Sequence, residues 1–228
     1  MKEIFSYGNM ESTAYMNLRT KNIDETKLKG KKASQIVKDL YEIHNMNIIA
    51  SGFFKSALIL IDQCLEDNFD YKADNIIFPI LFSVNHAIEV YIKSISCSMK
   101  ILLNENDKYA KNHCIKDLWD EAKRRIEAYG FAEDRKESKF RGMIENLEAY
   151  LDELTEKILE KYNDKTRYRI DFSRYPTTTN NTLQFYLKTY DYVTIDLENS
   201  KVVFEDIYDC LSTLANFYYD KAYDEIVE

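Results

Sequence analysis

The chain has 228 residues and a formal net charge of −8, which argues against a protein whose whole surface binds nucleic acid, but not against a local basic groove. Hydrophobic residues make up 45% of the chain, enough for the core of one large domain or two small ones. Five glycines and two prolines are too few for the many tight turns of a β-sandwich or β-barrel, so long helices are favoured.

Residues 1–32 are polar and show no clear hydrophobic period, so we predict an N-terminal arm in front of a single helical domain over 33–228. The arm ends in the basic run Lys27–Lys32. Two interpretations stay open, a loosely docked arm or an arm that contacts a partner or a phosphate backbone. The first residues lack an uninterrupted apolar stretch, and we expect no signal peptide.

Two long helices are predicted next, over 33–66 and from about 74 to 103, because apolar residues recur at steps of three and four. Asp74 is a candidate N-cap of the second helix, and Pro79 is expected in or near its first turn. The connection of about eight residues predicts that the two helices pack antiparallel.

Three further helices follow in the predicted order. The first begins near Ile115, carries Trp119 on its buried stripe and is closed by Gly130. The second runs from about Lys139 to Tyr162, and its charged face is expected to be solvated with some ion pairing. The third runs from about Ser200 to the C-terminus.

Between the last two helices, 163–199 breaks the helical pattern and is predicted as a loop or hairpin insertion. Its stretches 183–188 and 192–196 are rich in β-forming residues and could pair as one short hairpin. The predicted fold class is therefore all-α, a bundle of about five helices with at most one small β-hairpin near the C-terminal third.

The four cysteines are widely scattered and form no Cys-x-x-Cys pair, so we expect reduced thiols in a cytoplasmic protein and no zinc site. The most apolar stretches, 46–65 and 76–95, are interrupted by charged and polar residues. We expect them to be buried helices rather than membrane spans.

The second long helix carries the strongest candidate site. His86, Glu89 and Lys93 are spaced i, i+3 and i+7 and lie within roughly 60° of each other on the helical wheel, opposite the apolar side. A histidine beside a carboxylate can transfer protons near neutral pH, and the lysine can hold an anion. The alternative is a polar helix face that is hydrated or hydrogen-bonded to a neighbouring helix.

Two other groups are candidates. His113 either stabilises the start of a helix or acts as a proton donor or RNA contact. Arg167, Arg169, Arg174 and Tyr175 could bind phosphates and stack on bases, or the loop that holds them could pair with the acidic face of the helix over 139–162. The chain has no glycine-rich phosphate loop, and its three histidines have no regular spacing, so we expect no cofactor and no metal.

These segments resemble the HEPN superfamily, compact α-helical domains common in prokaryotic toxin and antiphage systems. The similar features are the stretch His86–Lys93, the stretch His113–Trp119 after a loop, and the order long helix, long helix, loop, shorter helix over Ala33–Arg125. The Arg174-Tyr-Pro segment is similar to one that bacterial proteins append to such a domain.

The resemblance implies an RNA-linked role, since many HEPN members are metal-independent ribonucleases with an Arg followed about four to six residues later by a His at a dimer interface. No Arg precedes a histidine of this chain at that spacing. We therefore expect a non-catalytic or degenerate HEPN-like module of a bacterial antiphage defence or toxin–antitoxin assembly, acting through a protein partner or homodimer, with RNA as a second candidate partner. One alternative is a ribonuclease with a nonstandard catalytic set of His86, Glu89, His113 and Arg174, and another is a structural subunit of a larger complex.

Overall fold

The computed structural model describes residues 33–105, 113–130, 134–159, 173–174, 177, 181 and 193–227. Its helices, in chain order, are α1 (Ala33–Glu66), the 3₁₀ helix η2 (Phe69–Tyr71), α2 (Lys72–Leu102), α3 (Ile115–Tyr129), α4 (Asp134–Met143), α5 (Glu145–Leu159) and α7 (Leu197–Val227). The described part of the chain contains no β-strand, and the predicted all-α class is confirmed.

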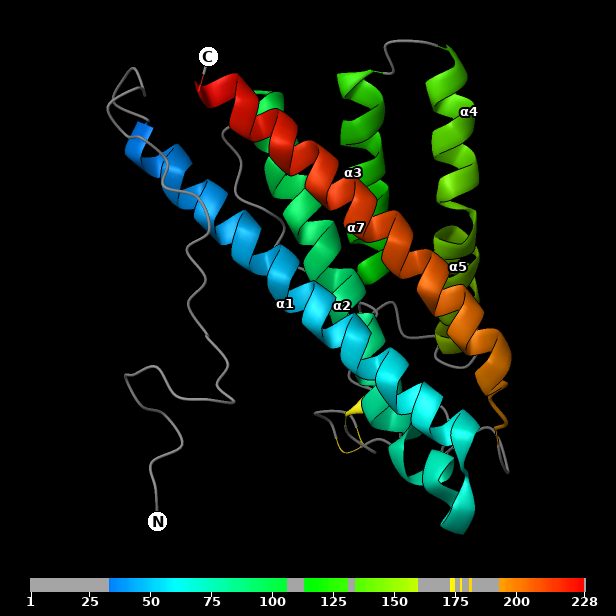
Figure 1. Ribbon diagram of the computed structural model, residues 1–228. Helices are drawn as coiled ribbons and strands as arrows, with labels where there is room; N and C mark the ends of the chain where they lie inside the picture. The colour runs from blue at the N-terminus through cyan, green and yellow to red at the C-terminus, as the bar shows by residue number, and fades with distance from the viewer. Residues whose placement is uncertain are drawn as a thin grey trace, which may run out of the picture.

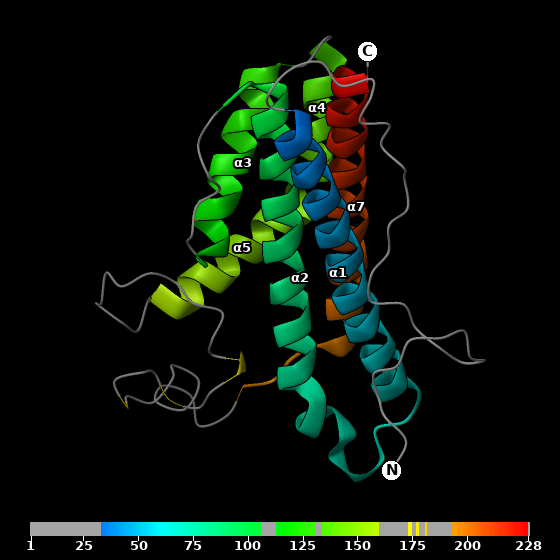
Figure 2. The same ribbon diagram turned by 90° about the vertical axis from the view of Figure 1, so that its left-hand side faces the viewer.

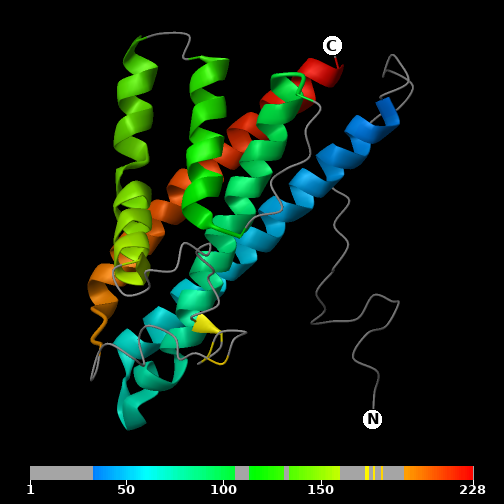
Figure 3. The same ribbon diagram turned by 180° about the vertical axis from the view of Figure 1, so that it is seen from behind.

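Helix α2 is the centre of the bundle. It packs antiparallel against α1, as predicted, and α7 lies alongside both helices and runs parallel to α2 (Figures 1 and 2). Helix α3 packs against another side of α2, and α4 and α5 run back beside α3 until α5 reaches α7 (Figure 3). A side chain on α2 can therefore contact three different helices.

The burial of α2 follows the pattern of its sequence. Val84, Ala87, Ile88, Ile92 and Ile95 have no exposed surface, as expected for the apolar side of the helix. They belong to one hydrophobic core that also includes residues of α1, α3, α4, α5 and α7. Because the apolar side of α2 is buried in this core, the orientation of its opposite, polar side is fixed.

The short helix α3 also agrees with its prediction. It ends at Tyr129, and Gly130 follows with φ +90°, a backbone conformation that favours glycine. Trp119 is completely buried on its inner face. Its indole Nε1 donates a hydrogen bond to Oε1 of Glu148 on α5 at 3.1 Å.

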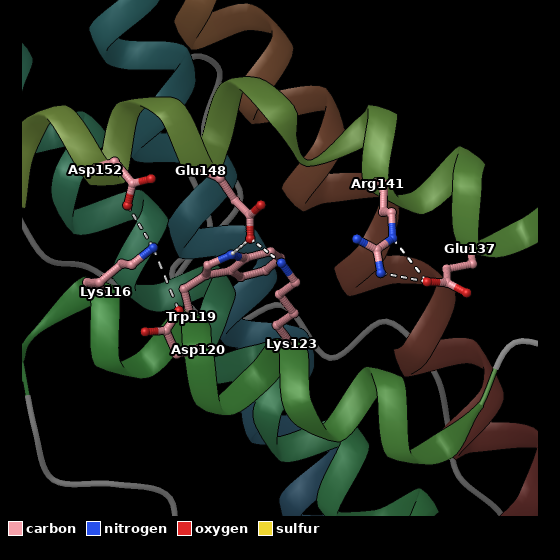
Figure 4. Close-up of polar contacts among 8 residues, drawn as sticks. All are labelled: Lys116, Trp119, Asp120, Lys123, Glu137, Arg141, Glu148 and Asp152. Atoms are coloured by element: carbon pink, nitrogen blue, oxygen red, sulfur yellow. Dashed lines mark hydrogen bonds and ion pairs between the residues drawn. The ribbon is translucent and has the colours of Figure 1, made fainter.

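Polar contacts join α3 to α5 on their outer side (Figure 4). Lys123 Nζ lies 2.6 Å from Glu148 Oε1, and Lys116 Nζ lies 2.8 Å from Asp152 Oδ1. The expected ion pairing of the charged face is therefore present, and it is directed toward α3. Other acidic residues of α5, such as Glu145 and Glu156, are exposed.

The start of α2 differs from the prediction. The helix begins at Lys72, and its N-cap position is Tyr71 in the left-handed region, so Asp74 lies inside the first turn. Asn68 takes over part of the capping, because its side-chain Oδ1 accepts a hydrogen bond from the Ala73 N–H at 2.8 Å. With this earlier start, Pro79 lies deeper in the helix than its first turn.

The helix predicted from Lys139 to Tyr162 is two helices. Helix α4 starts earlier than predicted, at Asp134. The prediction missed this start because the first turns of α4 are polar and show no apolar period. The break between α4 and α5 falls at Ile144, two residues after Gly142, which has a low helix propensity. Residues 160–162 lie outside the described part of the chain.

The predicted hairpin stays untested. Residues 193–196, which belong to its second half, have no strand structure, and its first half lies outside the described residues. The predicted arm over 1–32 lies outside them as well. None of the four cysteines, all of which are described, forms a disulfide.

Two helical stretches, Gln35–Glu66 and Phe69–Leu102, are long and apolar enough to cross a membrane by length and composition alone, as core helices of soluble bundles also are. Only 28% and 44% of their most apolar windows are buried in the bundle. On α1 the outward side includes Ile49 and Ile59, which are 48% and 57% exposed. Both helices thus contribute to the core and to the surface.

Candidate functional site

The candidate site is built around Glu89, on the side of α2 that faces the start of α3. The Glu89 side chain is only 5% exposed. Its Oε1 atom lies 2.5 Å from Lys93 Nζ and 2.8 Å from His113 Nδ1. A carboxylate this deeply buried is costly unless it is paired, and both partners meet this need. The polar side of α2 is therefore a packed and charged surface at this point.

His113 comes from the segment that leads into α3, and its side chain is 65% exposed. A carboxylate can only accept a hydrogen bond, so Nδ1 is the nitrogen that donates to Glu89. This contact orients the imidazole and leaves its other nitrogen, Nε2, without a role in the pairing with Glu89. His113 is thus a largely exposed histidine whose ring is held in place by a buried carboxylate.

His86 lies one helical turn before Glu89 in a more apolar setting. Its ring stacks on Phe82 with centroids 5.6 Å apart and meets Phe53 of α1 edge-on at 4.7 Å. Burial lowers the pKa of His86 below its ordinary value of 6.5, and the positive charges of Lys93 and nearby cationic side chains act in the same direction against Glu89. His86 is therefore predominantly neutral at pH 7 and can accept a proton.

Arg174 reaches the same region from a different part of the chain. Its guanidinium carbon lies 5.2 Å from the centroid of the Phe82 ring, within the range of a cation–π contact. The Arg174 side chain is exposed, whereas its neighbour Ser173 is buried. An open depression of about 460 Å³ lies here, lined by Phe78, Pro79, Phe82, Ser173 and Arg174.

The fold thus brings together five of the predicted site residues, His86, Glu89, Lys93, His113 and Arg174. Glu89 contacts two of the others directly, and the charges of Glu89, Lys93, His113 and Arg174 all act on the His86 imidazole. We refer to these five residues as the Glu89 cluster. The other three predicted residues, Arg167, Arg169 and Tyr175, lie outside the described part of the chain.

Sequence reasoning missed the aromatic part of this region. Phe78 and Phe82 precede His86 at steps of four, so the spacing that places all three on one side of α2 was present in the sequence. Phe53, from α1, could not be found in this way, because its contact with His86 depends on the packing of α1 against α2.

The cluster combines two cationic side chains, one carboxylate and two histidines. Among the described residues, no three His, Cys, Asp or Glu side chains come together in a way that could hold a metal ion. Burial raises the pKa of the Cys114 thiol, next to His113, to about 11. This thiol is therefore protonated at neutral pH and is a poor nucleophile.

Comparison of the chain with protein-family models, with curated proteins and with solved structures finds no match.

Proposed function

We propose that this chain is a HEPN-like module of a bacterial antiphage defence or toxin–antitoxin assembly, and that the Glu89 cluster is its RNA-binding site. Support for the HEPN-like fold comes from the succession of two long antiparallel helices and a shorter one, with His86–Lys93 and His113–Trp119 meeting in space. The observation that carries the RNA site is that Lys93, His113 and Arg174 lie along one side of α2, all near enough to act on His86.

Charge supports this assignment. The whole chain is acidic, but Lys93 pairs with Glu89 and Arg174 lies near enough to act on His86, so the cluster holds two permanent positive charges and one carboxylate. Lysine and arginine are the usual partners of phosphate oxygens, and such contacts supply most of the affinity for RNA. With Glu89 counted, the permanent charges of the cluster sum to +1, on a chain whose net charge is −8.

A second candidate function is metal-independent cleavage of the bound RNA. In such a reaction a base removes the proton of a ribose 2′-hydroxyl, the 2′-oxygen attacks the phosphorus, and an acid protonates the departing 5′-oxygen. The products are a 2′,3′-cyclic phosphate and a 5′-hydroxyl. His86, neutral at pH 7, suits the base, His113 suits the acid, and Lys93 or Arg174 would stabilise the charge on phosphorus. The sequence lacks the HEPN Arg–His signature, but the convergence of these side chains favours this candidate.

Binding is tested with fluorescently labelled single-stranded RNA and tRNA, by anisotropy at fixed salt. We expect Arg174→Gln to weaken binding about tenfold, the effect of losing one charge-assisted contact. Arg141→Gln is the matched control, because Arg141 is an exposed arginine of α4 that is 2.7 Å from Glu137 and far along the chain from the cluster. Equal affinities of the two variants and the wild type would contradict the proposed site.

Cleavage is tested with the same RNAs in EDTA and then with Mg²⁺ or Mn²⁺. Cleavage in EDTA that is lost in His86→Ala and His113→Ala, both folded and still able to bind, would establish the second candidate. Binding without cleavage would leave the chain as an RNA-binding module.

A further inference from the structure

The side of α2 that carries the Glu89 cluster changes from aromatic to charged residues along the helix. Phe78, Phe82 and His86 follow each other at steps of four, each step about 6 Å along the helix axis. Beyond His86 the same side carries Glu89 and Lys93. One end of this strip is therefore aromatic and the other is charged, and Arg174 lies over the aromatic end.

The depression at the aromatic end is open and has mostly apolar walls. Phe78 is 37% exposed, Pro79 is exposed, and Phe82 forms the wall under the Arg174 guanidinium. Its volume of about 460 Å³ falls within the ~300–1,000 Å³ that small-molecule sites occupy. A flat ring fits such a place, with an aromatic face to stack on and a guanidinium plane beside it.

We propose that this depression is a subsite for one unpaired nucleobase of the RNA strand whose phosphates bind the Glu89 cluster, so that the ligand is single-stranded RNA and not duplex. This inference rests on the proposed function. Unpaired bases are free to stack on aromatic side chains and on arginine, whereas the bases of a duplex are stacked on each other.

The dimensions of the strip agree with a strand that lies along α2. Phe82 and Lys93 are separated by about 16 Å along the helix axis. A strand of a few nucleotides can therefore place a base at Phe78 and Phe82 and still reach Lys93 with a phosphate. Among the described residues that line the depression none is a carboxylate, so none of these repels the neighbouring phosphate.

The test uses a short single-stranded RNA that carries 2-aminopurine, whose fluorescence is quenched by stacking, and the duplex of the same sequence. We expect the wild type to bind the single strand more tightly than the duplex and to quench the probe. Phe78→Ala should weaken single-strand binding by about 5- to 100-fold and abolish the quenching. Phe217→Ala, a change of a 51% exposed phenylalanine on α7, should do neither.

Two further variants separate stacking from apolar contact and from effects on folding. Phe78→Leu keeps an apolar side chain without a ring and should lose affinity, whereas Phe78→Trp should retain it. Unchanged single-strand affinity and quenching in Phe78→Ala and Phe78→Leu, or equal affinity for duplex, would overturn the base subsite while leaving the phosphate site intact. Failure of the wild type to bind any of these RNAs would overturn both proposals.

Discussion

Two buried or half-buried carboxylates of this protein have nearly the same partners and different surroundings. Glu148 on α5 accepts from a ring nitrogen, Trp119 Nε1, at 3.1 Å and from Lys123 at 2.6 Å. Glu89 on α2 accepts from a ring nitrogen, His113 Nδ1, at 2.8 Å and from Lys93 at 2.5 Å. Each carboxylate joins its own helix to α3 or to the residues just before it.

The difference lies in what the ring can do. The Trp119 indole is completely buried and does not titrate, so its hydrogen bond to Glu148 can only fix α5 on α3. The His113 side chain is 65% exposed, so a ligand in solution can reach it, and it lies near a second histidine, His86. The same pattern of a carboxylate, a ring nitrogen and a lysine is thus a structural clamp in one place and a candidate site in the other.

The largest expected contrast is between the two rings. Trp119→Ala should lower the free energy of unfolding by about 3–5 kcal/mol, because it removes a large, fully buried side chain. His113→Ala should lower it by only about 1 kcal/mol, because most of that ring is already in water and Glu89 keeps Lys93 as a partner. Urea denaturation of both variants measures the two values. Similar losses in both would show that His113 is a structural residue like Trp119.

A smaller contrast is expected between the two carboxylates. Glu89→Gln should cost about 2 kcal/mol of stability, since it leaves the nearly buried Lys93 ammonium without its counter-charge. Glu148→Gln should cost about 1 kcal/mol, since Glu148 is 30% exposed and Lys123 is 28% exposed. Denaturation midpoints compare the two. A larger loss of stability for Glu148→Gln than for Glu89→Gln would contradict the idea that the more buried ion pair contributes more.

The smallest effect concerns pH. Burial lowers the pKa of His86, so the unfolded chain binds a proton before the folded protein does as the pH falls. Neutral His86 therefore contributes fully to the free energy of unfolding above pH 6.5, its ordinary pKa, and this contribution is lost as the pH falls below that value. One proton changes the free energy of unfolding by at most about 1.4 kcal/mol per pH unit. His86→Phe should reduce the loss of stability between pH 7 and pH 5, as measured by urea midpoints. An unchanged pH profile in this variant would contradict the assignment.

The sequence was sufficient for the parts of the fold that depend on local pattern. The helix over 33–66 and the end of α3 at Gly130 were predicted because apolar period and glycine chemistry act over a few residues. The cap of α2 was misplaced because Asn68 contacts the Ala73 N–H across the η2 turn. The break at Ile144 was missed because the apolar stripe continues through it, with Phe140, Ile144 and Leu147 all buried.

The site was predictable in its residue types and not in its arrangement. His86, Glu89 and Lys93 share one side of a helix by spacing alone. The contact of His113 with Glu89 depends on the packing of α3 against α2, and the placement of Arg174 over Phe82 joins residues that are far apart in the sequence. Neither contact follows from helical period, because both are tertiary.

The proposal that the Glu89 cluster binds RNA is tested most directly by nuclear magnetic resonance of the three histidines, labelled with ¹⁵N and titrated with a short single-stranded RNA. His44 is the internal control, since it lies on α1 beside Tyr219, about 13 Å along the helix axis before Phe53, which contacts His86. We predict that the His86 and His113 resonances shift in proportion to bound RNA while those of His44 stay in place. Equal shifts at all three histidines, or none at His86 and His113 when RNA is bound, would contradict the central claim.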